Sequence, residues 1–271
     1  MKGVRARDFG KLTAKDICKK TIDYGFDTVS LSLSRALIEI TDTDNIDNEL
    51  LLAIKDVFNN YNVGISSLCA HLRFSCEDKE KRDRNFKIYS RYLRYGKMLG
   101  ARNIALKSGS YNDDHSLHFK NHTNEGYRKF ADYTYSLAEQ AEMLEIDIAI
   151  EGAFHHIIYD NKSIKRLIDD ISSPRLRVIF DPVHLITMEN YKEQEFLIKE
   201  AFYLFGDKID VIHLKDFVVA GTDIILADHG MGMFDYETLF DEIHKSKNEI
   251  DIIIEGLNVS RYTEAIRLLD M

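Results

Sequence analysis

The sequence predicts an α/β fold, a single (β/α)8 TIM barrel with a parallel eight-stranded sheet that takes up residues 1–271 as one domain. The chain has 271 residues, the usual size of such a barrel. Short apolar runs alternate with longer amphipathic segments from one end of the chain to the other. Eight such runs with no spare strand favour a closed barrel over an open doubly wound sheet.

The eight expected strands are short segments of apolar, extended pattern. In chain order they are Gly3–Arg7, Thr28–Leu33, Val63–Cys69, Asn103–Lys107, Asp147–Glu151, Arg177–Asp181, Asp210–His213 and Asp251–Glu255. Amphipathic segments between them predict helices, and the clearest helical face is Tyr127, Phe130, Thr134, Leu137, Ala141 and Leu144. Gly25, Gly100 and Gly206 fall where helices should end, so we expect a left-handed backbone conformation at each of them.

Composition limits the partners that this chain can have. Hydrophobic residues make up 45% of it, and its formal net charge of −9 would repel a phosphate backbone, so nucleic acid is not expected as a partner. The N-terminus lacks the apolar stretch of a signal peptide, and no apolar run approaches the roughly 18 residues of a membrane helix. These features predict a cytoplasmic protein with no membrane partner. Three cysteines without a CxxC pair are expected to be reduced thiols.

Charged residues interrupt four successive apolar strands where each strand ends. Glu151 ends the fifth, Asp181 the sixth, His213 the seventh and Glu255 the eighth. The carboxyl ends of barrel strands converge on one mouth, where three carboxylates would repel one another. A divalent cation is the simplest compensation, and mixed oxygen and imidazole ligands suit Mn²⁺, Co²⁺, Zn²⁺ or Mg²⁺. The sequence therefore predicts that these four residues hold one divalent metal ion, although for any single residue the start of a solvated loop is an equal alternative.

Other polar residues near the strand ends are candidate substrate contacts. They are His184, three residues after Asp181, and Lys215, Lys107, His155 and His71, with His156, Arg7 and Asp8 in similar positions. A lysine at the rim with its ammonium in water, or a histidine in an exposed loop, is the alternative for each of them. No GxGxxG motif follows the first strand and no GxxxxGK[ST] motif occurs, so nucleotide binding is not expected.

At these positions the sequence resembles the xylose isomerase-like barrel superfamily, which includes tagatose and psicose 3-epimerases, inosose-processing enzymes and endonuclease IV. The segments that carry the resemblance are Ile150-Glu151-Gly152, Phe180-Asp181-Pro182-Val183-His184, Val211-Ile212-His213-Leu214-Lys215-Asp216, Gly230-Met231-Gly232-Met233-Phe234-Asp235-Tyr236 and Ile254-Glu255. The resemblance implies that Glu151, Asp181, His213 and Glu255 bind one metal and that His184 contacts substrate. It also implies that Glu151 and Glu255 act from opposite faces of a bound sugar, one removing a proton from carbon and the other returning one.

Such chemistry is physically reasonable for this residue set. A C–H bond next to a carbonyl becomes acidic when the developing enediolate is stabilised, which a Lewis-acidic metal does. A positioned carboxylate then contributes about 10²–10⁴-fold as a general base. We therefore expect a metal-dependent isomerase or epimerase acting on a small-molecule carbohydrate: a sugar, a sugar phosphate or an inosose. Val219 stands where the epimerases carry an arginine, so the substrate is not expected to be handled as tagatose or psicose are. Whether the chain forms a homo-oligomer stays open.

Two other functions fit the same residues. An endonuclease IV-like DNA-repair enzyme would add His71, His115 and the Asp228-His229 pair to hold three zinc ions, but the acidic balance disfavours a DNA surface. A non-catalytic barrel that binds a metabolite is the second alternative, because a fold alone does not establish activity. Metal content separates one ion from three or none.

Overall fold

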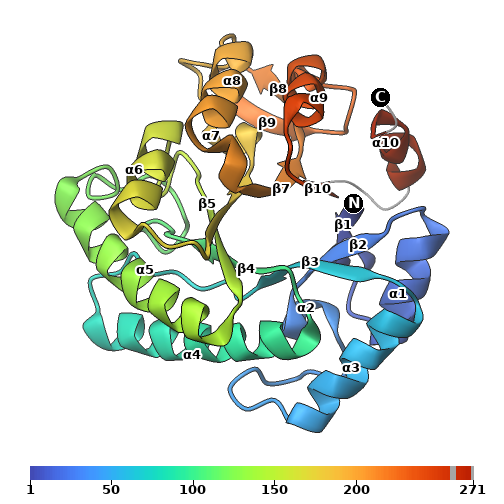
Figure 1. The fold of residues 1–271 in the computed structure, drawn as a ribbon. Coiled ribbons are helices and arrows are strands. Elements are labelled where there is room, and N and C mark those ends of the chain that lie inside the picture. The colour runs from blue at the N-terminus through green and yellow to red at the C-terminus, as the bar shows by residue number, and fades with distance from the viewer. Residues whose placement is uncertain (257–260, 270–271) are drawn as a thin grey trace.

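The computed structural model describes residues 1–256 and 261–269, and it confirms the predicted (β/α)8 barrel. Eight parallel strands close in the order β1-β10-β7-β6-β5-β4-β3-β2, with the helices outside them (Figure 1). The barrel strands are β1 Lys2–Arg5, β2 Thr28–Leu31, β3 Gly64–Cys69, β4 Asn103–Lys107, β5 Asp147–Glu151, β6 Leu176–Phe180, β7 Ile209–Leu214 and β10 Asp251–Ile254.

Helices follow the strands and cover the outside of the barrel (Figure 1). They are α1 Ala14–Asp23, α2 Leu33–Ala36, α3 Asn48–Asn60, α4 Lys79–Leu99, α5 Asn124–Leu144, α6 Asn161–Ile171, α7 Pro182–Leu185, α8 Gln194–Phe205, α9 Tyr236–Lys245 and α10 Tyr262–Leu268, with 3-10 turns η1 Ala6–Phe9 and η2 Gly206–Lys208. The apolar face predicted for α5 is confirmed, since Tyr127, Phe130 and Leu137 are buried against the core. In the described part of the chain, no helix combines the length and the apolar character needed to cross a bilayer.

The predicted boundaries differ from the structure by one or two residues in six of the eight strands, most at the ends of the first two. The first strand ends at Arg5, and Arg7 lies in the turn η1; the second ends at Leu31, and Leu33 begins α2. Gly25 and Gly100 have the expected positive φ of 82° and 75°. The prediction for Gly206 is wrong, because its φ of −57° is right-handed and the chain passes from α8 directly into η2 without a reversal.

The expectation of no spare strand is also wrong. After β7 the chain forms an antiparallel hairpin of β8 Asp216–Ala220 and β9 Asp223–Ala227, outside the barrel. The buried Asp216 carboxylate at its start accepts backbone hydrogen bonds from Phe217, Gly230, Gly232 and Phe234, at 2.8 to 3.0 Å. One carboxylate therefore ties both the hairpin and the loop that follows it to the end of β7.

Apolar residues form two cores, one on each side of the strands. The larger core lies between the sheet and the helices. The smaller lies inside the barrel and consists of Ala105, Ala149, Ile179, Val211 and Ile253. Because successive side chains of a strand point to opposite faces, the residues two positions further along these strands must also face the barrel interior.

Buried ion pairs close the opposite end of the barrel, where the strands begin. Asp210, at the start of β7, accepts from Arg177 Nε and Nη2 at 3.0 and 2.8 Å. Asp251, at the start of β10, lies 3.3 Å from Arg102 Nη1 and 3.0 Å from the amino group of Met1. These carboxylates are almost fully buried, so the cationic partners must compensate for the hydration that each carboxylate loses on folding.

Removing one partner of this network should destabilise the protein. In Arg177→Met, the buried Asp210 carboxylate keeps only Arg102, at 3.4 Å. We expect the free energy of unfolding, measured by chemical denaturation, to fall by about 2 kcal/mol. Lys199→Met removes an exposed pair with Glu195 and should leave the free energy of unfolding almost unchanged. Equal losses in the two variants would contradict the role given to burial here.

Candidate active site

The candidate site stands directly on the small core inside the barrel. Five of its side chains come two residues after an interior apolar residue, which is why all five face the mouth. They are Lys107 after Ala105, Glu151 after Ala149, Asp181 after Ile179, His213 after Val211 and Glu255 after Ile253. The alternation of strand side chains thus brings together residues that are up to about 150 positions apart in the sequence.

Carboxylates and imidazoles gather closely at this mouth. Ligand atoms of Glu151, Asp181 and His184 lie within 4.8 Å of one another, and so do those of Asp181, His213 and Glu255. The four residues predicted as metal ligands are therefore brought together, with Asp181 common to both groups. His184, predicted as a substrate contact, has the position of an additional ligand: its Nδ1 lies 3.0 Å from Glu151 Oε1 and 3.1 Å from Asp181 Oδ2.

His213 is the histidine of the cluster whose ring nitrogens are both free to bind a ligand. It is buried, and neither of its ring nitrogens has a hydrogen-bond partner. Its Nδ1 lies 3.5 Å from Glu151 Oε1, 3.7 Å from Glu255 Oε1 and 4.0 Å from Asp181 Oδ2. Two ligands that are each about 2.0–2.2 Å from one ion stand about 3–4 Å apart, so this spacing fits a divalent cation between imidazole and carboxylates. Glu151 Oε2 is likewise buried without a partner.

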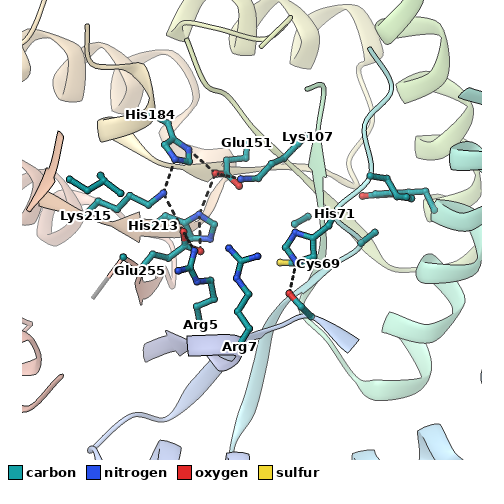
Figure 2. A pocket seen from close by; sticks show the side chains of 17 residues that line it. Arg5, Arg7, Cys69, His71, Lys107, Glu151, His184, His213, Lys215 and Glu255 are labelled. Atoms are coloured by element: carbon teal, nitrogen blue, oxygen red, sulfur yellow. Dashed lines mark hydrogen bonds and ion pairs between the residues drawn. The ribbon is translucent and has the colours of Figure 1, made fainter. Parts of the chain in front are cut away.

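Two lysines compensate the negative charge (Figure 2). Lys215 is 4% exposed; its ammonium donates to Asp181 and lies 2.8 Å from His184 Nε2 and 3.2 Å from Glu255 Oε2. Lys107 donates to Glu151 Oε1 at 2.7 Å from a half-exposed position. The sequence predicted both as substrate contacts near strand ends, and the structure places the Lys215 ammonium among the carboxylates themselves.

Both glutamates are held as carboxylates. Burial alone would raise the pKa of Glu151, but Lys107, His213 and His184 outweigh it and bring the pKa well below the ordinary value. Burial opposes ionisation of Glu255 in the same way, and His213, Lys215 and Arg5 bring its pKa below the ordinary value. Each carboxylate is therefore ionised at neutral pH.

Two cavities that share lining residues lie at these groups. The inner cavity, of about 250 Å³, is lined by Glu151, His184, His213, Lys215, Glu255 and Lys107, together with Arg5, Arg7 and His71 (Figure 2). The outer cavity, of about 530 Å³, is lined by His155, His156, His115, Arg35 and Arg73 and shares Arg7, His71, Lys107 and His184 with the inner one. His71, predicted as a substrate contact, lines both cavities, with its Nε2 2.5 Å from Ser32 Oγ. His155 lines only the outer cavity and is exposed.

A family model described as the xylose isomerase-like TIM barrel matches residues 18–270. The chain belongs to this family. Solved structures with the same fold include the apo form of 3-keto-D-glucoside 4-epimerase, YcjR, from E. coli, at 15% identity and TM-score 0.75, covering 100% of this chain and 99% of that one. Comparison with curated protein sequences finds no match.

Two further structural neighbours are a probable dehydratase and a protein with a bound metal. The probable 3-DHS dehydratase AsbF from Bacillus anthracis is 12% identical, with TM-score 0.77 and coverage of 100% and 99% of the two chains. The IOLI protein, solved with a binding zinc atom, is 15% identical, with TM-score 0.72 and coverage of 99% and 95%. At these identities the likeness shows the fold, and the site of this xylose isomerase-like barrel has to be judged from its own side chains.

The additional histidines considered for a three-zinc site do not join the metal-ligand groups. Among residues 1–256 and 261–269, the two groups found both contain Asp181, and His71, His115 and His229 belong to neither. His229 is buried, with its Nε2 2.8 Å from the Leu214 carbonyl oxygen. Val219, which stands where the epimerases of the resemblance carry an arginine, lies on β8 opposite Ile224.

Stability in mild acid should depend on His156. Burial, and then the Lys107 ammonium, lower the pKa of this histidine from 6.5 to about 3. Between these pH values the unfolded chain takes up a proton that the folded protein excludes, so the folded state loses stability as pH falls below about 6.5. We expect His156→Gln to flatten this loss by up to about 1.4 kcal/mol per pH unit between pH 6 and 4 in urea unfolding. Parallel profiles for the two proteins would refute the assignment.

Proposed function

We propose that this xylose isomerase-like barrel is a metal-dependent isomerase or epimerase that acts on a carbohydrate by proton transfer at carbon through an enediolate. One observation carries the proposal: His213 is buried with no hydrogen bond to either ring nitrogen, and three carboxylates surround its Nδ1 at 3.5 to 4.0 Å, which is ligand spacing. A buried imidazole that makes no hydrogen bond costs free energy, and a cation between it and the carboxylates would satisfy both. The donor set suits Mn²⁺, Co²⁺, Zn²⁺ or Mg²⁺.

The residues that would hold the ion are Glu151, Asp181, His213 and Glu255, with His184 next to them. When bound there, a divalent ion supplies Lewis acidity that stabilises negative charge on substrate oxygens. His184 and Asp181 are fixed by the turn after β6, because the Asp181 side chain accepts from the backbone N–H of His184 at 3.1 Å. The α7 turn therefore sets the position of one carboxylate and one imidazole together.

Glu151 and Glu255 are the proposed acid and base. They reach the inner cavity from β5 and from the end of β10, which are separated in the barrel by β6 and β7. Both are ionised, so either can accept a proton from substrate carbon, and the other would return to carbon a proton that it takes up from water. Which of them begins depends on the stereochemistry of the substrate. Lys107, His184, Lys215 and His71 line the same cavity and are the proposed contacts to substrate hydroxyls, with His155 further out.

The neighbours and the site geometry support this function over an endonuclease IV-like one. The solved relatives include a 3-keto-D-glucoside 4-epimerase and a protein with a bound zinc atom, although their identity to this chain is low. Both groups of candidate ligands among the described residues contain Asp181, so they mark a single metal site. This favours one ion over the three of an endonuclease IV-like site.

The proposal is tested by metal content and by proton exchange. Purified protein incubated with Mn²⁺ or Co²⁺ and then desalted should retain about one ion per chain by elemental analysis. In D2O, one of a panel of ketoses, inososes and their phosphates should acquire deuterium at carbon only when the metal is present. Protein that retains no ion after this loading contradicts the proposed site, and exchange that continues in the presence of a chelator contradicts the proposed chemistry.

A further inference from the structure

The outer cavity has an unusual charge for a protein with a formal net charge of −9. Seventeen of the described residues line it, and among these are four lysine and arginine side chains and five histidines but no carboxylate. The cations are Arg7, Arg35, Arg73 and Lys107. A cavity lined by one sign of charge concentrates the field and attracts ligands of opposite charge, so this mouth favours anions although the whole chain is acidic.

Two of the four cations have their charge compensated within the protein. Arg73 donates to the Asp113 carboxylate and, at 2.7 Å, to the Asn112 carbonyl oxygen. Lys107 donates to Glu151. Arg7 and Arg35 form no ion pair and no side-chain hydrogen bond with any residue of the described ranges 1–256 and 261–269. These two guanidiniums are thus the ones available to a ligand.

Arg7 is the better placed of the two unpaired arginines. Its guanidinium points into the cavity between His71 and His213, without a dashed line to any neighbour (Figure 2). Burial and the Arg5 and Arg35 charges lower the pKa of Arg7, and Glu255 offsets only part of this effect. A half-buried guanidinium that faces like charges is stabilised strongly by an added anion. Arg7 lines both cavities, so a ligand whose anionic group binds Arg7 in the outer cavity can extend its remaining atoms into the inner one.

The histidines nearby add hydrogen-bonding groups without competing negative charge. Burial and the Arg35 and Arg7 charges lower the pKa of His71 to about 3, and the pKa of His156 is lowered to a similar value. Both rings are therefore neutral at pH 7. The Nδ1 atom of His156 is buried without a hydrogen-bond partner, so this polar atom is also available to a ligand.

We infer that the substrate carries a compact oxyanion, a phosphate monoester or a carboxylate, which Arg7 and Arg35 bind in the outer cavity. This inference rests on the proposed function, because it places the sugar carbons in the inner cavity beside Glu151 and Glu255 while the anion stays outside. Guanidinium groups bind phosphate and carboxylate oxygens through paired, charge-assisted hydrogen bonds, which fix orientation as well as adding affinity. The anion subsite thereby determines which carbon of the chain reaches the two glutamates.

The test measures binding, so it does not depend on turnover. Isothermal titration calorimetry on the protein as purified compares D-fructose, D-fructose 6-phosphate and D-galacturonate, with inorganic phosphate as the minimal probe. We expect at least one of the two anionic sugars to bind about 10-fold or more tightly than fructose, and this advantage to be lost in Arg7→Gln. Whichever anionic sugar shows the effect identifies the group as phosphate or carboxylate. Equal binding of all three sugars overturns the inference.

Further variants separate this subsite from general electrostatic attraction. Arg35→Gln changes an exposed residue on α2, so it should weaken binding of the anionic sugar without affecting the fold. Arg128→Gln removes the same charge from the exposed surface of α5 and should leave binding unchanged. Equal losses in Arg7→Gln, Arg35→Gln and Arg128→Gln would contradict a specific subsite. Arg7-dependent binding of an anionic sugar without any proton exchange would contradict the proposed function and support the anion subsite. Proton exchange on neutral sugars, with no preference for anionic ones, would support the proposed function and contradict the subsite.

Discussion

Glu255→Gln should lower the rate of metal-dependent proton exchange by about 100-fold or more, the loss expected when a general acid or base is removed. Glutamine has the shape of glutamate but cannot accept a proton from carbon. The rate is best expressed per bound ion, at saturating Mn²⁺, because Glu255 is also a proposed metal ligand. Circular dichroism should show the fold unchanged, since the residue lies at the mouth, after the last residue of β10.

The matched control is Glu139→Gln, which makes the same chemical change on the exposed surface of α5. It should leave the exchange rate per bound ion unaltered. Full activity in Glu255→Gln with the ion bound would defeat the two-glutamate mechanism, and loss of the ion alone would restrict Glu255 to ligation.

Lys215→Met should destabilise the metal-free protein by about 3–5 kcal/mol, the usual cost of leaving a buried charge without its partner. The Lys215 ammonium is buried against Asp181, and Glu255 lies 3.2 Å from it. Burial lowers the pKa of Lys215, but Asp181, Glu255 and Glu151 raise it by more than burial lowers it, so the lysine is charged. Methionine keeps a similar length and removes the charge, so the carboxylates are left to repel one another.

A divalent ion should compensate for that loss. The ion and the ammonium depend on the same carboxylates, so Mn²⁺ should raise the melting temperature of Lys215→Met more than that of the unmodified protein. Lys199→Met, on the exposed surface of α8, should respond to Mn²⁺ as the unmodified protein does. If Lys215→Met is as stable as the unmodified protein in the presence of chelator, the ammonium is not the counter-ion of this cluster.

The barrel and the four ligand candidates follow from local sequence pattern. Apolar runs of strand length alternate with helical segments, and this alternation requires no long-range information. The same pattern indicates where the side chains point: Glu151, Asp181, His213 and Glu255 each stand two residues after an interior residue of their own strand. Eight parallel strands then bring these positions to one mouth, because a closed sheet has only one carboxyl end. Convergence of the four could therefore be predicted from the sequence.

Tertiary structure alone decided which cation pairs with which anion. Lys107, Lys215, Arg5 and Arg7 all stand near strand ends, and nothing in their spacing shows that Lys215 enters the carboxylate cluster while Arg7 stays unpaired. The register between strands and the packing of long side chains determine these contacts, and both depend on residues distant in the sequence. The β8–β9 hairpin is a different case, because its strands pair with each other across the two-residue turn Gly221-Thr222, a local pattern that the sequence analysis missed. Only the hydrogen bonds that Asp216 accepts from the loop after the hairpin depend on more distant residues. Strand alternation sets the direction of a side chain, and only the closed barrel sets its neighbours.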